Sequence, residues 1–200
     1  MTDAIEEAAL AALGGGLVVL PTDTVHGIGT RPDDASATGR LFAAKHRLRD
    51  LELPVLVPSA ASAREIARFD ERAERLASRF WAGPLTIVLP RTAGSRDWDL
   101  GGDPSTIGVR MPHHPLTLAV LARTGPLAVS SANRSGAPTP GSCEGLVETF
   151  GDAVAVYVCQ DEPVEGTAST VVDLAHGEPR ILRHGALAEE LVLAAAADAS

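Results

Sequence analysis

Four basic side chains from three separate segments could together bind one polyanionic ligand. Lys45 is the only lysine among the 17 lysine and arginine residues, and Arg47 follows two positions later. An ammonium group is a compact point charge suited to phosphate oxygens, whereas a guanidinium is a planar fork. Arg110 and Arg183 end the apolar segments TIGV and PRIL. A guanidinium there is expected to be partly buried and to need an anionic partner, either a ligand carboxylate or an internal aspartate. The four cations fit a nucleoside triphosphate plus another acid.

Two loops offer small polar groups beside these cations. PTDTVHGIG, residues 21–29, supplies the hydroxyls of Thr22 and Thr24, with Gly27 and Gly29 allowing a ligand to approach the backbone. The alternative is an ordinary turn whose hydroxyls bond their own backbone. In SSANRSG, Ser131 and Asn133 lie two positions apart, so an extended backbone turns both to the same side. They could hold a phosphate or a carboxylate, or belong to a plain surface loop.

Several standard sites are absent from the sequence. It contains no GxxxxGK[ST] phosphate loop and no GxSxG nucleophile elbow. Its histidines lack metal-ligand spacing, so a structural zinc is not expected. Cys143 and Cys159 have no CxxC spacing and no neighbouring histidine, which predicts free thiols with a packing role.

Composition indicates one domain spanning residues 1–200. The formal charge of -9 argues against a general nucleic-acid-binding surface, although a local basic groove remains compatible with it. The acidic N-terminal segment does not resemble a signal peptide, and no apolar run is long enough to span a bilayer. We therefore expect a cytoplasmic protein without membrane contact.

Hydrophobic patterning predicts an α/β domain with a mixed sheet, because the later strands are joined too briefly for helical crossovers. Polar segments follow the strand ends, where open α/β sheets bind ligands. Strands are expected at 17–20, 53–57, 85–89, 106–110, 127–130, 153–158, 169–174 and 179–183, with loops at 22–32 and 131–142. Helices are expected from Asp3 to Gly14, over 33–46, in two short stretches capped by Ser62 and Asp70, and over 115–123, 143–150 and 187–197.

Seven segments in order resemble the YrdC-like family of threonylcarbamoyl-AMP synthases: PTDTVHGIG, KHR, FWAGPLTIVL, GVRMPHHP, SSAN with its following SG, STVVD and PRILRHG. The first is similar to the family's Pro-Thr-(Asp/Glu)-Thr-Val-Tyr-Gly-Leu-Gly, and KHR to its Lys-x-Arg. The resemblance covers about residues 5–187. It implies a YrdC/RibB-like twisted mixed sheet with flanking helices and a large concave pocket.

The resemblance also implies a reaction. L-threonine and bicarbonate form a carbamate that attacks the α-phosphate of ATP, giving threonylcarbamoyl-AMP and pyrophosphate. A tRNA threonylcarbamoyl transferase complex then modifies the adenosine next to the anticodon of tRNAs that read ANN codons. Mg²⁺ is expected with ATP, and no tightly bound cofactor is expected. With no evident nucleophile or general base, positioning and electrostatics should dominate catalysis.

By the same resemblance, Lys45 and Arg47 neutralise the triphosphate and serve as the catalytic cations. The other nucleotide-binding residues are expected to be Thr86, Ser131, Asn133, Thr139 and Arg183. L-threonine is expected to meet Thr22, Arg110 and Ser169, with Arg110 taking its carboxylate through a bidentate fork.

The chain departs from the family pattern at three points. His26 stands where tyrosine is usual, Leu48 replaces a proline, and Leu51-Glu52 replaces a later Lys-Pro or Asn-Pro. The last two changes lie in the loop expected at the pocket mouth. The chain also resembles the single-domain members, without the C-terminal domain of longer ones.

Two other functions remain open at this point. One is an RNA-binding YrdC-like module in ribosome or tRNA maturation, using the same cations for weak RNA contact. The net charge and the few aromatic residues disfavour it. The other is a carbamoyl-adenylate step in hydrogenase cofactor assembly, disfavoured because the zinc-finger-like and acylphosphatase-like neighbours are missing.

Overall fold

The strands form one nine-stranded mixed sheet in a computed structural model that describes residues 2–159, 164 and 166–197. The strand order is β7-β1-β2-β6-β3-β5-β4-β8-β9. Pairs β1–β7, β3–β5 and β4–β8 are parallel, and the others are antiparallel. The strands are β1 Val18–Leu20, β2 Gly27–Thr30, β3 Val55–Leu56, β4 Leu85–Pro90, β5 Thr106–Arg110, β6 Leu127–Ser131, β7 Val156–Tyr157, β8 Thr170–Asp173 and β9 Arg180–Arg183. The predicted α/β mixed sheet is confirmed.

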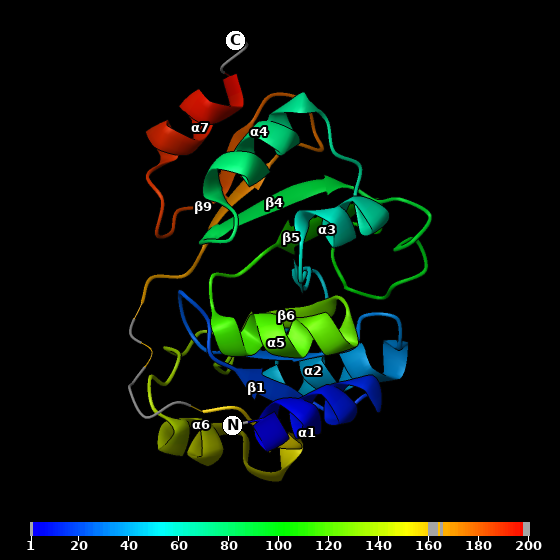
Figure 1. The fold of residues 1–200 in the computed structure, drawn as a ribbon, viewed down its shortest axis with the longest axis vertical. Coiled ribbons are helices and arrows are strands. Elements are labelled where there is room, and N and C mark those ends of the chain that lie inside the picture. Colours follow the sequence, from blue (N-terminus) through cyan, green and yellow to red (C-terminus); the bar gives the residue numbers. More distant parts are fainter. Residues whose placement is uncertain (1, 160–163, 165, 198–200) are drawn as a thin grey trace.

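The helices flank this sheet on both sides (Figure 1). Asp34 caps α2 by accepting bonds from the amides of Ser36 and Ala37. The predicted cap of α4 by Asp70 is confirmed. The predicted cap of α3 by Ser62 is wrong, because Ser59 holds that place and accepts a bond from the Ser62 amide. The helices are α1 Thr2–Leu13, α2 Ala35–Lys45, α3 Ala60–Ile66, α4 Glu71–Phe80, α5 Pro115–Thr124, α6 Cys143–Phe150 and α7 Glu189–Ala197, with a 3₁₀ turn at Gly151–Ala153.

Strand β2 lies within the segment predicted to be a loop. Its sequence, GIGT, is typical of a turn, yet it pairs with both β1 and β6. Its glycines are required by packing, since a Cβ at Gly27 or Gly29 would lie 2.5 Å from a methyl carbon of Val129. The prediction failed because the reason for both glycines is on a strand distant in sequence.

The sheet has a separate hydrophobic core on each face. Helices α1 and α5 lie side by side in the lower half of Figure 1. They pack on the β1–β6 region through a core that includes Ala12, Leu20, Val120 and Val129. The larger core, on the opposite face, joins the sheet to α2, α3 and α4 through residues such as Leu41 and Leu76.

Strand alternation turns the predicted site residues to one face of the sheet. Leu85 and Ile87 belong to the larger core, so Thr86 between them faces the opposite side. Val109 likewise faces that core, which turns Arg110 to the same side as Thr86. This is the face that α1 and α5 cover on the β1–β6 half. Beyond these helices, the same face carries Thr86 of β4 and Arg110 of β5, next to the apolar Val88 and Val171.

Candidate functional site

A polar cavity of about 90 Å³ lies on this face. Its walls come from the β1–β2 loop, the ends of β5 and β6, strand β4 and the segment before β8. Seven of the ten residues predicted to bind substrates line it: Thr22, Arg47, Thr86, Arg110, Ser131, Ser169 and Arg183. The predicted concave pocket is therefore present, and the structure brings together side chains from widely separated segments.

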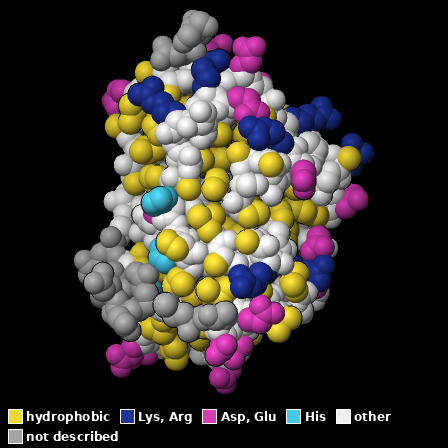
Figure 2. Space-filling model, viewed as in Figure 1, with side chains coloured by type: hydrophobic (Ala, Val, Ile, Leu, Met, Phe, Trp, Pro, Cys, Tyr) yellow, Lys and Arg dark blue, Asp and Glu magenta, His cyan; other side chains and the backbone are white. Residues whose placement is uncertain are grey.

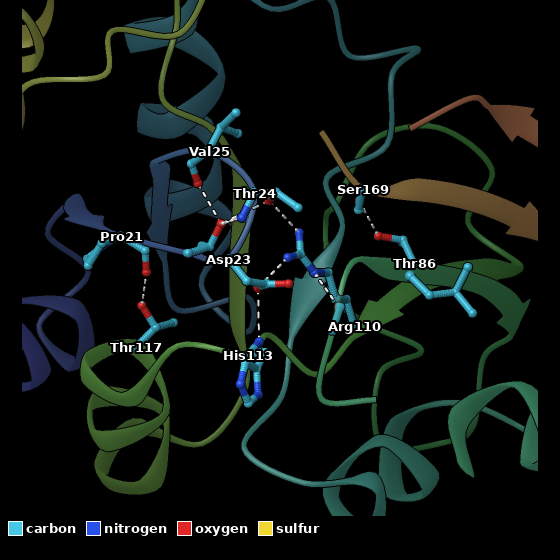
Figure 3. Close-up of polar contacts among 12 residues, drawn as sticks. Pro21, Asp23, Thr24, Val25, Thr86, Arg110, His113, Thr117 and Ser169 are labelled. Atoms are coloured by element: carbon cyan, nitrogen blue, oxygen red, sulfur yellow. Dashed lines mark hydrogen bonds and ion pairs between the residues drawn. The ribbon is translucent and has the colours of Figure 1, made fainter. Parts of the chain in front are cut away.

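Arg110 is 6% exposed and lies at the centre of a polar network (Figure 3). Its guanidinium donates to an Asp23 carboxylate oxygen at 2.6 Å, to the Thr24 hydroxyl at 3.0 Å and to the Gly83 carbonyl at 3.0 Å. Burial lowers the pKa of Arg110, and the charge of Asp23 opposes that shift. Of the two partners considered from sequence, the internal aspartate is the one present.

Thr22 lies in the same wall, but its hydroxyl forms hydrogen bonds within its own loop. It donates to the Val25 carbonyl at 2.6 Å and accepts from the Thr24 amide at 3.1 Å. The two threonine hydroxyls are 2.9 Å apart. The loop thus has the self-bonded geometry of the alternative interpretation, and its threonines are fixed at the cavity wall.

Thr86 on β4, Ser169 just before β8 and Arg183 on β9 form a second network. The hydroxyls of Thr86 and Ser169 are 2.9 Å apart and close together in Figure 3. Arg183 donates to the Ser169 carbonyl at 3.0 Å and to its hydroxyl at 2.9 Å. Ser169 therefore links one predicted nucleotide-binding residue to the other.

Arg47 and Arg183 also border a second cavity of about 260 Å³. This cavity shares Arg47, Pro54, Thr86 and Arg183 with the first one, so the two are neighbours. Its remaining wall is largely apolar and includes Leu51, Val88, Gly108, Val171 and Leu182. A ligand that spans both cavities would have one polar, anionic part and one apolar part.

Lys45 is 1% exposed and lies beneath the loop after β6. Its ammonium group donates to the carbonyls of Ser131 and, at 2.6 Å, Asn133. Burial lowers its pKa to about 8, and the charge of Arg47 adds to the shift. Lys45 thus supports the predicted nucleotide-binding loop from below, adjacent to the cavity wall.

The loop after β6 is ordered by its own polar groups. The Ser131 hydroxyl donates to the Asn133 carboxamide oxygen at 2.5 Å, which confirms that the two side chains lie together. The Thr139 hydroxyl reaches the same oxygen at 3.5 Å. The Asn133 amide donates to the carbonyls of Arg134 and Ala137. Asn133 and Thr139 therefore lie behind Ser131, which contributes to the cavity wall.

The predicted cations share one electrostatic environment. Burial lowers the pKa of Arg47 and Arg183, and each charge lies close enough to affect a neighbour. Arg183 lowers the pKa of both Arg47 and Arg110, while Arg47 lowers that of Lys45. A cluster of cations that repel one another favours a ligand with several negative charges. On the outer face seen in Figure 2, by contrast, acidic and basic side chains are interspersed.

The sequence did not predict two contributors to the site, Asp23 and the Glu52–Arg91 ion pair. It also left the role of His26 undecided. Asp23 fixes Arg110, and the Glu52–Arg91 ion pair lies beside the second cavity. Asp23 is part of the PTDTVHGIG segment, but nothing local marks its distant partner. His26 lines the first cavity, where burial lowers its pKa against an opposing hydrogen bond to the Pro140 carbonyl.

The predicted free thiols are wrong, because Cys143 and Cys159 form a disulfide. Cys143 begins α6, and Cys159 follows β7, with the chain reversing through the 3₁₀ turn between them. This reversal brings the two Cα atoms to 5.7 Å, within the range that a disulfide requires. The sequence separation of 16 gave no local signal for this pairing.

Two further findings concern metals and membranes. Within residues 2–159, 164 and 166–197, no group of three or more His, Cys, Asp or Glu side chains is placed to hold a metal ion. In the same part of the chain, no helix combines the length and apolarity needed to cross a lipid bilayer.

The fold and the cation-lined cavity define an α/β domain suited to a polyanionic ligand. A model of the Sua5/YciO/YrdC family, described as "Telomere recombination", matches residues 11–185. The chain belongs to this family.

Named relatives agree with this assignment. A Mycobacterium tuberculosis protein, provisionally named threonylcarbamoyl-AMP synthase, is 42% identical over 183 residues, which are 91% of this chain and 84% of that protein. The Pyrococcus abyssi threonylcarbamoyl-AMP synthase is 39% identical over 175 residues, 86% of this chain and 51% of that protein. The solved structure of P. abyssi Sua5 complexed with L-threonine aligns with a TM-score of 0.86 and 35% identity, covering 96% of this chain and 56% of that one. The chain thus spans about half the length of the P. abyssi protein.

Proposed function

We propose that this protein is a threonylcarbamoyl-AMP synthase, a transferase that consumes L-threonine, bicarbonate and ATP. The observation that carries the proposal is the cluster of Arg47, Arg110 and Arg183 around a polar cavity, with Lys45 behind its wall. The names of the relatives support it, as does the complex of P. abyssi Sua5 with L-threonine.

The two cavities suggest how the substrates are arranged. The adenine base suits the apolar second cavity, because a planar base gains from leaving water. The triphosphate then meets Arg47 and Arg183, which border both cavities. The threonine carboxylate is placed at Arg110 in the first cavity, where a fork of N–H donors suits a carboxylate. Ser169 lies between the two ends and reaches both Thr86 and Arg183.

The proposed reaction is a nucleotidyl transfer. The threonine amine and bicarbonate form a carbamate, with loss of water. A carbamate oxygen then bonds to the α-phosphorus of ATP, while the bond from that phosphorus to the bridging oxygen of pyrophosphate breaks. Negative charge grows on the phosphoryl oxygens and on the departing pyrophosphate. The fixed cations stabilise that charge without moving, which is the main help a protein gives such a transfer.

Mg²⁺ enters this proposal with ATP, as a companion of the substrate phosphates. Protein-bound Mg²⁺ in nucleotide sites is usually held by one or two carboxylates together with phosphates and water. Since the described residues offer no carboxylate cluster for a metal, we derive no step through a protein-bound ion. We further propose that the enzyme works in the cytoplasm, where its product passes to a tRNA threonylcarbamoyl transferase complex.

Product analysis tests the proposal directly. The purified protein is incubated with ATP, L-threonine and bicarbonate, and threonylcarbamoyl-AMP and pyrophosphate are measured by mass spectrometry and a coupled assay. Omitting any one substrate should abolish both products. ATP turnover that continues without L-threonine would contradict the proposal.

Matched arginine variants link the activity to the site. Arg47→Ala should lower kcat/KM for ATP by about 100-fold, as expected for removal of one preorganised charge. Arg123→Ala is the control, because Arg123 lies on α5 and pairs with Glu6 at the exposed surface. That variant should keep its activity within about twofold.

A further inference from the structure

A buried ion pair lies beside the second cavity, in the segment that departs from the family pattern. Arg91, directly after β4, and Glu52 approach to 3.5 Å, with side chains 4% and 18% exposed. Buried pairs contribute little net stability, because the cost of removing both charges from water offsets their attraction. Such a pair is better explained by the geometry that it imposes on its surroundings.

Arg91 organises the β4–β5 connection. Its guanidinium donates to three main-chain carbonyls, those of Thr106 at 2.6 Å, Trp98 at 2.7 Å and Ser95 at 3.1 Å. The Ser95 and Trp98 carbonyls lie within the connection, and Thr106 is the first residue of β5. A single buried side chain therefore holds the whole loop in one conformation.

That loop is packed directly on the segment after Lys45. The Gly102 amide donates to the Arg49 carbonyl, and the Leu53 amide donates to the Leu100 carbonyl, both at 2.8 Å. Gly102 has a positive φ of 61°, and a Cβ on it would lie 2.7 Å from the Glu52 Cβ. Only glycine fits there. The loop thus fixes the backbone on both sides of Glu52.

The fixed backbone in turn holds Arg47. The Nε of Arg47 donates to the Leu51 carbonyl at 3.1 Å, and a terminal nitrogen donates to the Glu52 carbonyl at 2.9 Å. These two carbonyls come from consecutive residues, so they set the plane of the guanidinium as well as its position. Arg47 borders both cavities in that orientation.

We propose that Glu52 and Arg91 are positioning residues that orient Arg47 for ATP. They act through the Leu51–Glu52 main chain and leave the threonine end of the site unchanged. The inference rests on the proposed function and extends it to Glu52, which departs from the family's usual pattern, and to its partner Arg91. The titratable and charged groups facing Glu52 are Arg91 and Asp103. Burial raises the pKa of Glu52 to about 8 against the attraction of Arg91.

Steady-state kinetics of three variants test this role. Glu52→Ala should raise KM for ATP at least tenfold and leave KM for L-threonine within twofold. Glu52→Gln should stay within threefold for both, because its amide oxygen can take the place of the carboxyl oxygen that faces the Arg91 guanidinium at 3.5 Å. Adding Glu52→Ala to Arg47→Ala should cause no further loss if Glu52 acts through Arg47. Equal losses for both substrates, failure of glutamine to rescue, or an additive double variant would each overturn the proposal.

Asp99→Ala provides a matched control. The Arg49–Asp99 pair joins the same two segments at 2.6 Å, but both side chains are exposed. Its removal should change KM for ATP less than twofold. A loss as large as that of Glu52→Ala would show that any link between the segments suffices, and would overturn the role of the buried pair.

An NMR measurement tests the same role without relying on enzyme activity or on the Glu52→Ala variant. The side-chain Nε–H signal of Arg47 in ¹⁵N NMR, assigned by its loss in Arg47→Lys, should be sharp in the wild type and exchange slowly with water. In Arg91→Lys it should broaden or exchange at least tenfold faster, while the fold stays intact by circular dichroism. An unchanged Arg47 signal would overturn the proposal. Absence of product from the wild type would instead contradict the proposed function alone.

Discussion

Arg110 and Asp23 approach to 2.6 Å in the wall of the first cavity, with their side chains 7% and 13% exposed. Asp23 also accepts from the His113 amide at 2.9 Å through the same oxygen (Figure 3). The carboxylate therefore holds the guanidinium from one side, while Thr24 and Gly83 hold it from others. An arginine fixed in this way keeps its direction before any substrate arrives.

Removing Asp23 should destabilise the protein strongly, because it leaves a buried guanidinium without its charge partner. We expect Asp23→Ala to lower the free energy of unfolding by about 3–5 kcal/mol. Urea denaturation monitored by circular dichroism measures the change. Asp33→Ala is the control, since the Arg31–Asp33 pair is exposed and should contribute less than about 1 kcal/mol. Equal effects at the two positions would contradict this account of the Arg110 network.

Sequence reasoning predicted those parts of the fold whose signals are local. The strands around Thr86 and Arg110 are apolar runs of the length expected for buried strands, and the structure has them. Strand β2 was not predicted, because its glycines are explained only by packing against the distant Val129. The disulfide was not predicted either, because only the chain reversal after α6 brings Cys143 close to Cys159.

The candidate site shows the same division. Type and position at strand ends were enough to nominate Arg110 and Arg183 as cations of the site, and both line the first cavity. The predicted burial is confirmed for Arg110 and wrong for Arg183, which is exposed on β9. Their partners could not be nominated, because hydrogen bonds such as Arg110 to Asp23 join segments far apart in the chain. The Glu52–Arg91 pair could not be predicted for the same reason, because its two residues lie in different segments of the chain.

The Thr86 and Ser169 hydroxyls should be energetically coupled, because they are 2.9 Å apart and buried. A double-mutant cycle of Thr86→Val and Ser169→Ala should give a coupling of about 0.5–1.5 kcal/mol in the free energy of unfolding. Combining Thr86→Val with Ser36→Ala, on the exposed side of α2, is the additive control. No coupling between Thr86 and Ser169 would mean that their contact contributes nothing in solution.

Lys45 should make activity fall as pH rises through about 8. Its pKa is lowered from 10.5 to about 8, so the ammonium that holds the Ser131 and Asn133 carbonyls behind the cavity wall is present below that pH and lost above it. The pH profile of kcat/KM for ATP measures the effect. It is recorded in the Glu52→Gln variant, because the pKa of Glu52 is also about 8 and its titration would overlap with that of Lys45. Lys45→Arg should lose activity and stability, because the larger guanidinium does not fit the buried space around Lys45, which is 1% exposed. Full activity in Lys45→Arg would contradict the need for a compact charge.

Glu52 should make stability fall as pH rises, opposite to an ordinary paired carboxylate. Its pKa is raised from 4.5 to about 8, so the folded protein binds the proton more tightly than the unfolded chain does. The resulting stabilisation is complete below about pH 4.5 and is lost as pH rises through about 8. Glu52→Gln does not titrate, so its stability relative to the wild type should increase between pH 5 and pH 9 (both values approximate limits of that window). Parallel urea curves across this range would show that Glu52 does not carry the shift.

The Cys143–Cys159 disulfide should stabilise the region that holds the loop after β6. It closes a sequence separation of 16 residues and ties the start of α6, directly behind that loop, to the end of β7. Loop-closure entropy for such a length corresponds to about 3 kcal/mol, so Cys143→Ser should lower the free energy of unfolding by about that amount. Thiol titration in denaturant provides the chemical check: the protein purified without reductant should show no free thiol, and two after reduction. Because cytoplasmic thiols are normally kept reduced, the same titration on protein alkylated in intact cells shows which form is present there. A wild type unaffected by reductant in urea denaturation would contradict a stabilising role for the disulfide.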